Sequence, residues 1–151
     1  MLELARESDW EAVNRLSVQV HDMHAAWRPD LYFHCEEPLT HDMFLDAICT
    51  KRLYVAKLQD VVVGYVLLSF LRREGAGIHR HKAVRIECIC VEELLRGQGI
   101  GMQMVADVRA LAKAFGCKEI LLSVHPENDK AVSFYQKCGF HIRTIKMDMK
   151  L

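Results

Sequence analysis

The chain has 151 residues, and its 20 lysines and arginines balance its 20 aspartates and glutamates, so that the formal net charge is zero. Because 51% of the residues are hydrophobic, the chain can bury the core of one domain and is not disordered. The zero net charge argues against a nucleic acid or a membrane surface as the main partner. The longest apolar run, residues 61–71, is too short to cross a bilayer, and the first ten residues lack a signal-peptide pattern. We therefore expect a single domain over residues 1–151 and a cytoplasmic location.

The first third of the sequence predicts a short edge strand and two helices. Residues 2–5 alternate in polarity, as a strand does. A first helix is predicted to run to about Ala26 after Ser8 or Asp9, either of which can cap it, because apolar residues recur at intervals of three and four. Pro29 then stops it. Thr40 is expected to cap a second helix that runs to about Cys49.

A β-hairpin is predicted next, from strands at residues 53–58 and 61–72 around a two-residue turn. Gly64 lies inside the second strand and indicates a bulge or a close approach of another backbone segment. The hydrophilic loop that follows, residues 73–82, carries two histidines and three lysines or arginines. Such a loop is either solvated or able to meet a phosphate.

The central stretch of the chain, residues 84–115, joins an apolar, β-branched strand to an amphipathic helix through a turn with three alternating glycines, Gly97, Gly99 and Gly101. A turn of this kind lets a ligand approach the backbone, and the N–H groups at a helix start attract an anion. Neither G-x-x-x-x-G-K-[ST] nor G-x-G-x-x-G is present. The pattern therefore predicts a diphosphate site that is neither a Walker A loop nor a dinucleotide fingerprint.

The last third predicts a strand, a helix and a further strand. Gly116 is expected to end the long helix, and residues 119–124 predict a buried strand that follows it in a right-handed parallel crossover. A short helix over residues 129–137 and a last strand or hairpin half over residues 140–150 complete the chain. No repeat or linker interrupts this order, so we expect one α+β domain.

The six cysteines include no C-x-x-C pair, which is the spacing of zinc ribbons and redox sites. Cys88 and Cys90 lie too close in sequence for an ordinary disulfide, and free thiols behave as small hydrophobic groups. His21 and His24 lie one helical turn apart, but the sequence places no third ligand beside them. We therefore expect free cysteines and no metal.

Two motifs resemble those of the GNAT superfamily of acyl-CoA-dependent N-acetyltransferases. Residues 96–101 read R-x-x-G-x-G, which is similar to the acyl-CoA-binding pattern Q/R-x-x-G-x-G/A. Residues 128–140 read N-D-K-A-V-S-F-Y-Q-K-C-G-F, which is similar to the later pattern N-x-x-A-x-x-F/L-Y-x-x-x-G-F. The resemblance covers residues 84–140 and implies a central mixed, mostly antiparallel sheet of six or seven strands. About four helices would flank this sheet, which would be splayed at the cofactor site.

The resemblance also implies acetyl-CoA as the co-substrate and assigns residues to it. Asn128 would bond the pantetheine arm. Tyr135 would approach the thioester sulfur and protonate the leaving thiolate, unless its ring only packs against the last strands. Backbone groups of the central strand would hold the pantetheine arm, namely Ile89, Cys90 and Val91. The diphosphate would lie on Arg96, Gly97, Gln98, Gly99, Ile100 and Gly101.

Glu87 is the residue that we expect to take a proton from the amine. A carboxylate in the middle of an apolar strand is costly to bury unless it is used or paired, and burial would raise its pKa towards neutrality. The alternative is a structural ion pair with Arg85 or with a basic residue of a neighbouring strand.

The function implied by the resemblance is transfer of an acetyl group to a primary amine of a small molecule or peptide, by direct attack of the amine. The alternative is an acyl-CoA sensor without turnover. A homodimer is compatible with either function. The acceptor groove is expected between the end of the first helix, the loop at residues 27–37, the charged hairpin and the last strand.

Overall fold

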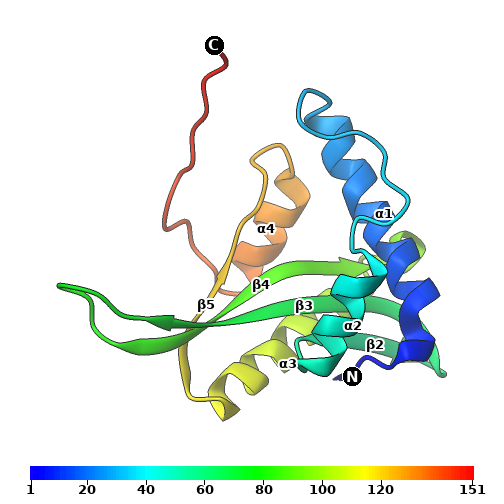
Figure 1. The fold of residues 1–151 in the computed structure, drawn as a ribbon, viewed down its shortest axis with the longest axis horizontal. Coiled ribbons are helices and arrows are strands. Elements are labelled where there is room, and N and C mark those ends of the chain that lie inside the picture. The colour runs from blue at the N-terminus through cyan, green and yellow to red at the C-terminus, as the bar shows by residue number, and fades with distance from the viewer.

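The computed structural model describes all 151 residues and contains one five-stranded sheet with helices on both faces (Figure 1). Short 3₁₀ turns at Glu7–Asp9 and Glu93–Leu95 precede α1 and the glycine loop. None of the helices is long and apolar enough to span a membrane. The elements are β1 (Leu2–Leu4), α1 (Trp10–Trp27), α2 (His41–Cys49), β2 (Leu53–Leu58), β3 (Val61–Arg73), β4 (His81–Val91), α3 (Ile100–Ala114), β5 (Cys117–Leu122) and α4 (Asp129–Lys137).

The strands lie in the order β1-β2-β3-β4-β5, and each pair is antiparallel except β4 with β5. The parallel pair is joined through α3, so the predicted strand–helix–strand crossover is confirmed, as is the mixed, mostly antiparallel α+β fold. The expected count of six or seven strands is wrong. Residues 140–150, which were expected to form the last strand, form none, because no neighbouring strand supplies their backbone hydrogen bonds.

Each face of the sheet has its own hydrophobic core. On one face α1 and α2 bury Leu16 and Phe44 against the sheet. On the other face α3 buries Met104 and Val108 against β3 and β4. α4 lies on the α3 side, where a ring atom of Phe134 approaches the first turn of α3. The candidate functional site therefore lies at the end of the sheet between α1 and α4.

Local chemistry explains the element boundaries. The Thr40 hydroxyl accepts a hydrogen bond from the Met43 backbone N–H at 3.3 Å, so the predicted cap of α2 is confirmed. Gly116 follows α3 with a φ of 72°, a left-handed conformation that favours glycine. The expected side-chain cap of α1 by Ser8 or Asp9 is wrong, because neither side chain bonds the first turn of α1 and the Asp9 carboxylate bonds the Arg6 N–H and pairs with Lys57 instead.

Gly64 marks a close approach of backbone segments, as its position in the strand predicted. The β2–β3 register shifts beside it, between Ala56 and Lys57. A Cβ added at Gly64 would lie 2.6 Å from the carbonyl oxygen of Cys90 and 3.1 Å from the sulfur of Met104. Only glycine lets β4 and α3 pack this tightly at the end of the sheet that carries the site.

Candidate active site

The glycine loop leaves a row of backbone donors free at the start of α3. Gly97 and Gly99 have φ values of 80° and 85°, and α3 begins at Ile100. The N–H groups of residues 97–102 donate to no acceptor within the protein. A Cβ at Gly97 or Gly99 would meet no atom within 4 Å, so the surface over the loop is open. Free N–H groups at a helix start form a site for an anionic group.

Gly101 has a different role from the other two glycines. A Cβ at this position would lie 3.2 Å from a ring carbon of Phe134. The missing side chain therefore lets α4 pack against the first turn of α3. The two motifs recognised in the sequence meet at this contact.

The sheet opens beside the glycine loop. β4 pairs with β5 only over Lys82–Ile86, whereas β4 continues to Val91. The stretch from Glu87 to Val91 therefore has no strand on that side, and the predicted splay is confirmed. Ile89 and Val91 pack towards α3 and Cys90 is buried towards α1. The edge of these three residues that faces away from β3 has no strand partner and borders the opening.

Two side chains hold the end of β4. Gln19, from α1, donates from its amide to the Val91 carbonyl oxygen at 3.2 Å and accepts from the Glu93 N–H at 3.2 Å. Arg96 donates from Nε to the same carbonyl at 3.2 Å, and its guanidinium lies 3.9 Å from the Met23 sulfur. The Arg96 charge is thus directed at the strand and would have to turn outward to reach a diphosphate. Sequence reasoning missed Gln19, whose only signal is a polar residue on the inward face of α1.

Asn128 caps α4, because its side-chain oxygen accepts from the Ala131 N–H at 3.1 Å. The amide nitrogen of the same side chain donates to no protein acceptor. A cap fixes the orientation of the side chain, so this NH₂ group is held in place for a ligand.

Tyr135 lies two turns further along and is half-buried between Phe134 and Phe140, with ring centroids at 5.2 and 5.7 Å. Burial raises the pKa of Tyr135 to about 12, with smaller contributions from nearby Cys88, Cys138 and Cys90. The phenol is therefore protonated at neutral pH and has no hydrogen-bond partner in the protein. Its neighbours place the ring between α4 and the unpaired end of β4, where a proton donor could serve a leaving group.

Glu87 lies at a bulge in β4. Cys88 pairs with Leu67 and Ile86 pairs with Leu68, so Glu87 has no partner on β3. The extra residue turns both Glu87 and Cys88 towards α1. The expectation that Glu87 is buried is wrong, because its side chain is exposed in an open groove. It makes no ion pair with Arg85 or with any other basic residue.

The groove in front of Glu87 lies between α1, the end of the following loop, and strands β3 and β4, and has a volume of about 240 Å³. Three of the segments expected around the acceptor do not line this groove, namely the loop at residues 27–37, the charged hairpin and residues 140–150. Its lining residues are Ser17, Val20, His21, His24, Pro38, Leu39, Met43, Tyr65, Leu67, Glu87 and Cys88.

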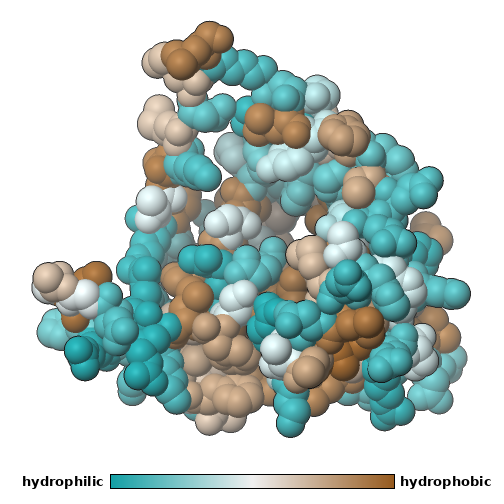
Figure 2. Space-filling model, in the orientation of Figure 1, coloured by the Kyte–Doolittle hydropathy of each residue, from teal (hydrophilic) through white to brown (hydrophobic).

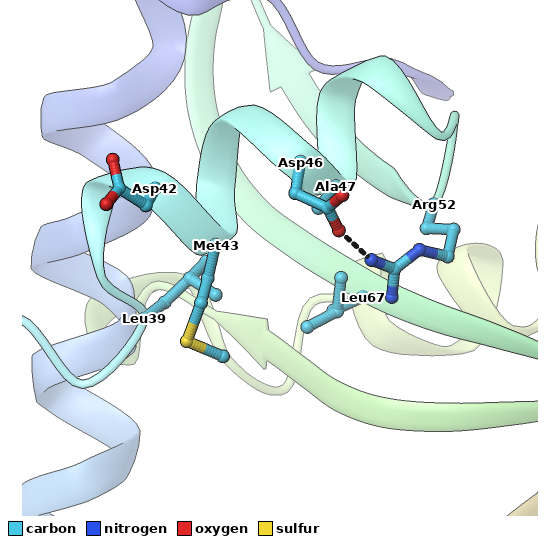
Figure 3. Close-up of a pocket in the computed structure, with 7 residues that line it drawn as sticks. All are labelled: Leu39, Asp42, Met43, Asp46, Ala47, Arg52 and Leu67. Carbon is cyan, nitrogen blue, oxygen red and sulfur yellow. Dashed lines mark hydrogen bonds and ion pairs between the residues drawn. The ribbon is translucent and has the colours of Figure 1, made fainter.

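A second pocket, of about 300 Å³, continues this groove beneath α2 (Figure 3). The two cavities share Leu39, Met43 and Leu67 as an apolar wall. At the far end of the second pocket Asp46 pairs with Arg52 at 2.5 Å. A ligand amine at Glu87 would thus have an apolar surface beside it.

His24 is the titratable group on the α1 side of the groove. Burial lowers the pKa of His24, and the neighbouring His125 and His21 lower it further. The rings of His24 and His125 lie 6.0 Å apart, which joins α1 to the loop after β5. The imidazole is therefore neutral at pH 7. No group of three or more metal-ligating side chains is present.

Comparison with known proteins gives one consistent family. The model of the acetyltransferase (GNAT) family matches residues 17–140. An uncharacterised N-acetyltransferase of Bacillus subtilis, YvbK, is 35% identical over 99 residues, which are 65% of this chain and 58% of that protein. The thialysine N-epsilon-acetyltransferase of mouse is 32% identical over 145 residues, which are 89% of this chain and 80% of that protein. A probable glucosamine 6-phosphate N-acetyltransferase of rice is 31% identical over 83 residues, 55% of this chain and 45% of that protein. The match spans about half the length of the Bacillus and rice relatives.

The solved structures of two other proteins have the same fold as this chain. A mutant of the BH1408 protein of Bacillus halodurans superposes with a TM-score of 0.95 at 27% identity, covering 100% of this chain and 99% of that one. An aminoglycoside N-acetyltransferase, AAC(6')-Iy, solved in complex with CoA, gives a TM-score of 0.70 over the whole of both chains. At 19% identity the second likeness shows a common fold and no more.

Proposed function

Because the chain belongs to the GNAT family of acetyltransferases, we propose that it moves an acetyl group from acetyl-CoA to a primary amine of a small molecule or peptide. The observation that carries this proposal is the open glycine loop with free N–H groups at the start of α3, beside the unpaired end of β4. The diphosphate of CoA would lie on the glycine loop, and the amide-bearing arm of CoA would lie beside the unpaired end of β4. Residues 96–101 would bind the diphosphate, and the backbone of Ile89, Cys90 and Val91, with the Asn128 amide, would bind the arm.

The reaction that fits this arrangement is direct attack of the amine on the acyl carbon. The amine reaches the groove as an ammonium ion and must lose a proton before it can attack, and Glu87 is the proposed acceptor of that proton. As the C–N bond forms and the C–S bond breaks, the nitrogen loses one proton and the sulfur gains one. Tyr135 is the proposed donor to the sulfur, since its phenol is protonated and otherwise unpaired.

The groove favours an acceptor whose amine is carried on a partly apolar body. Its wall combines Leu39, Met43 and Leu67 with the polar groups of His24 and Glu87. The names of the curated relatives are those of enzymes that acetylate amines of small molecules, glucosamine 6-phosphate and thialysine. We propose a small amine or the amino-bearing end of a peptide as acceptor.

A panel of amines and peptides, assayed for CoA release from acetyl-CoA, tests this function. The panel should include an amino sugar phosphate, thialysine, lysine and peptides with free amino ends. We expect release that depends on both acetyl-CoA and one class of amine. Tight binding of acetyl-CoA by calorimetry, with no release above hydrolysis for any amine, would favour the sensor without turnover.

Gly99→Val is expected to weaken acetyl-CoA binding by well over tenfold, because the added methyl groups project into the open surface where the diphosphate would lie. A valine at a φ of 85° is also strained, so the variant needs a matched control. Gly116→Val is that control. Gly116 has a φ of 72°, an equally open surface, and a place at the other end of α3, roughly 20 Å away.

Calorimetric titration of both variants separates strain from blocked binding. Both should lose thermal stability to a similar degree, and only Gly99→Val should lose affinity. If the two folded variants bind acetyl-CoA with equal affinity, the diphosphate does not bind at this loop.

A further inference from the structure

The pocket beneath α2 has a fixed arginine at its far end. Arg52, directly before β2, donates from Nε to the Thr50 hydroxyl at 2.8 Å and from Nη2 to the Asp46 carboxylate at 2.5 Å. Its backbone is held as well, because its N–H donates to the Ala47 carbonyl oxygen and its own carbonyl oxygen accepts from the Leu68 N–H. The position of the guanidinium is therefore set by the protein before any ligand binds.

This end of the pocket keeps a free donor beside free acceptors. Nη1 of Arg52 donates to no acceptor in the protein, and Figure 3 shows it directed away from α2. Oδ1 of Asp46 accepts no hydrogen bond, and Asp42, one turn earlier on the same side of α2, pairs with no basic residue. A guanidinium N–H suits a carboxylate and the aspartates suit an ammonium group. The two kinds of group together match the head of an α-amino acid.

An apolar surface joins this charged end to Glu87. Leu39, Met43 and Leu67 line both the pocket and the groove. Met43 is 53% exposed, although its side chain is apolar. On the face of the molecule that carries α2, Figure 2 shows hydrophobic surface between hydrophilic residues. Methylene groups laid along this wall would remove apolar surface from water, which favours binding.

The strand order sets the distance between the two charged ends. Cys88, the neighbour of Glu87 on β4, pairs with Leu67 on β3. Leu67 in turn pairs with Leu53 on β2, and Arg52 directly precedes Leu53. Glu87 and the start of β2 are therefore two strand spacings apart, which is about 10 Å. A chain of four methylene groups with a hydrogen bond at each end covers a distance of about this length.

We propose that the acceptor is a free α-amino acid with a second amine at the end of its side chain, and that Arg52 and Asp46 select it. This inference rests on the proposed function, because it specifies the acceptor of the same transfer. The carboxylate of the amino acid would bind Arg52, its α-ammonium group would bind Asp46 and Asp42, and its side-chain amine would reach Glu87. The acetyl group would pass from the CoA sulfur to this side-chain nitrogen, which loses one proton while the sulfur gains one.

A free amino acid fits the two ends better than a diamine or an internal residue of a peptide. A diamine would set an ammonium group against the Arg52 guanidinium. A lysine inside a peptide has amide groups in place of both charges of the head, so Arg52 and Asp46 would lose their ionic partners. Both alternatives are separated by the acceptors used in the test.

Three acceptors of similar length test the head group on the unaltered protein. Lysine has both charges of the head, cadaverine lacks the carboxylate, and 6-aminohexanoate lacks the α-amine. With saturating acetyl-CoA, we expect kcat/KM for lysine to exceed that for either analogue by roughly tenfold to a hundredfold, since each analogue leaves one charged group of the pocket unpaired. Mass spectrometry of the product should place the acetyl group on the side-chain nitrogen. 2,3-Diaminopropionate has one methylene group in its side chain and should not be acetylated there, because its amine cannot reach Glu87.

The outcomes that contradict this proposal differ from those that contradict the function itself. Equal kcat/KM for lysine and cadaverine, acetylation of the α-nitrogen, or CoA release with other amines but not with lysine would overturn the amino-acid acceptor and leave the acetyltransferase function standing. No release with any amine would overturn both.

Arg52→Gln then tests the residue. It should raise KM for lysine by roughly tenfold to a hundredfold, leave kcat nearly unchanged, and bring kcat/KM for lysine close to that for cadaverine. The ratio between the two acceptors does not depend on how much of the variant is folded. Arg72→Gln is the matched control, because Arg72 is an exposed arginine of β3 outside both cavities and should keep the wild-type ratio. An unchanged ratio in Arg52→Gln would overturn the proposal.

Discussion

Replacing Tyr135 by phenylalanine is expected to lower the rate of acetyl transfer about a hundredfold and to leave the thermal melting temperature nearly unchanged. The substitution keeps the ring, which packs against Phe134 and Phe140 at 5.2 and 5.7 Å. It removes only the hydroxyl, which has no partner in the protein, so no hydrogen bond of the folded chain is lost. The affinity for acetyl-CoA should therefore stay close to that of the wild type, and the loss should appear in single-turnover transfer.

The pH dependence makes this test sharper. Because burial raises the pKa of Tyr135 to about 12, the phenol keeps its proton throughout the assay range. The factor by which Tyr135→Phe lowers the rate of acetyl transfer should therefore be the same at every pH between about 6 and 9. Stability behaves differently, since the unfolded tyrosine ionises near pH 10 while the folded one does not. Above that pH the wild type loses a share of stability that the phenylalanine variant keeps.

Tyr54→Phe is the matched control, because Tyr54 is also buried but lies on β2 away from the opening of the sheet. It should leave transfer unchanged. If Tyr135→Phe instead lowers the melting temperature strongly, the Tyr135 hydroxyl stabilises the fold. An intact melt with undiminished transfer would mean that the thiolate leaves without help from this residue.

Glu87→Gln should lower turnover by about a hundredfold at saturating acetyl-CoA, because glutamine keeps the shape of the side chain and cannot accept the proton of the ammonium. The side chain is exposed and makes no ion pair, so neither folding stability nor acetyl-CoA affinity should change. Stopped-flow transfer and calorimetry on one preparation measure the two quantities separately.

Glu93→Gln is the control for this substitution, since Glu93 is another exposed carboxylate near the same end of β4 and lies outside the groove. Its turnover should match that of the wild type. If Glu87→Gln also keeps the wild-type rate and pH profile, the amine loses its proton elsewhere. The neutral imidazole of His24, on the α1 side of the groove, is then the group to replace.

Features that depend on neighbouring residues could be predicted from the sequence. The Thr40 cap, the hairpin around residues 59–60, the glycine turn and the parallel crossover each depend on a few adjacent side chains and on the chirality of the chain. The opening between β4 and β5 followed from the family resemblance.

Features that depend on pairing between distant segments could not be predicted. Its place in the middle of an apolar strand predicted that Glu87 is buried, and the bulge that turns it into the groove is a property of the β3–β4 register. Gln19 was missed because its partners, Val91 and Glu93, are more than 70 residues away. Residues 145–150 have the alternation of a strand, but alternation supplies no neighbour to bond with.

The unpaired end of β4 has a consequence for how the protein behaves before it meets its co-substrate. It is an open sheet edge inside the molecule, made of β-branched and sulfur-bearing residues from Ile89 to Val91. Open edges of this composition promote aggregation. When the arm of CoA lies there as proposed, its amides take the place of the missing strand. The co-substrate then acts as a folding ligand, and purification in its presence should preserve protein that would otherwise be lost to precipitation.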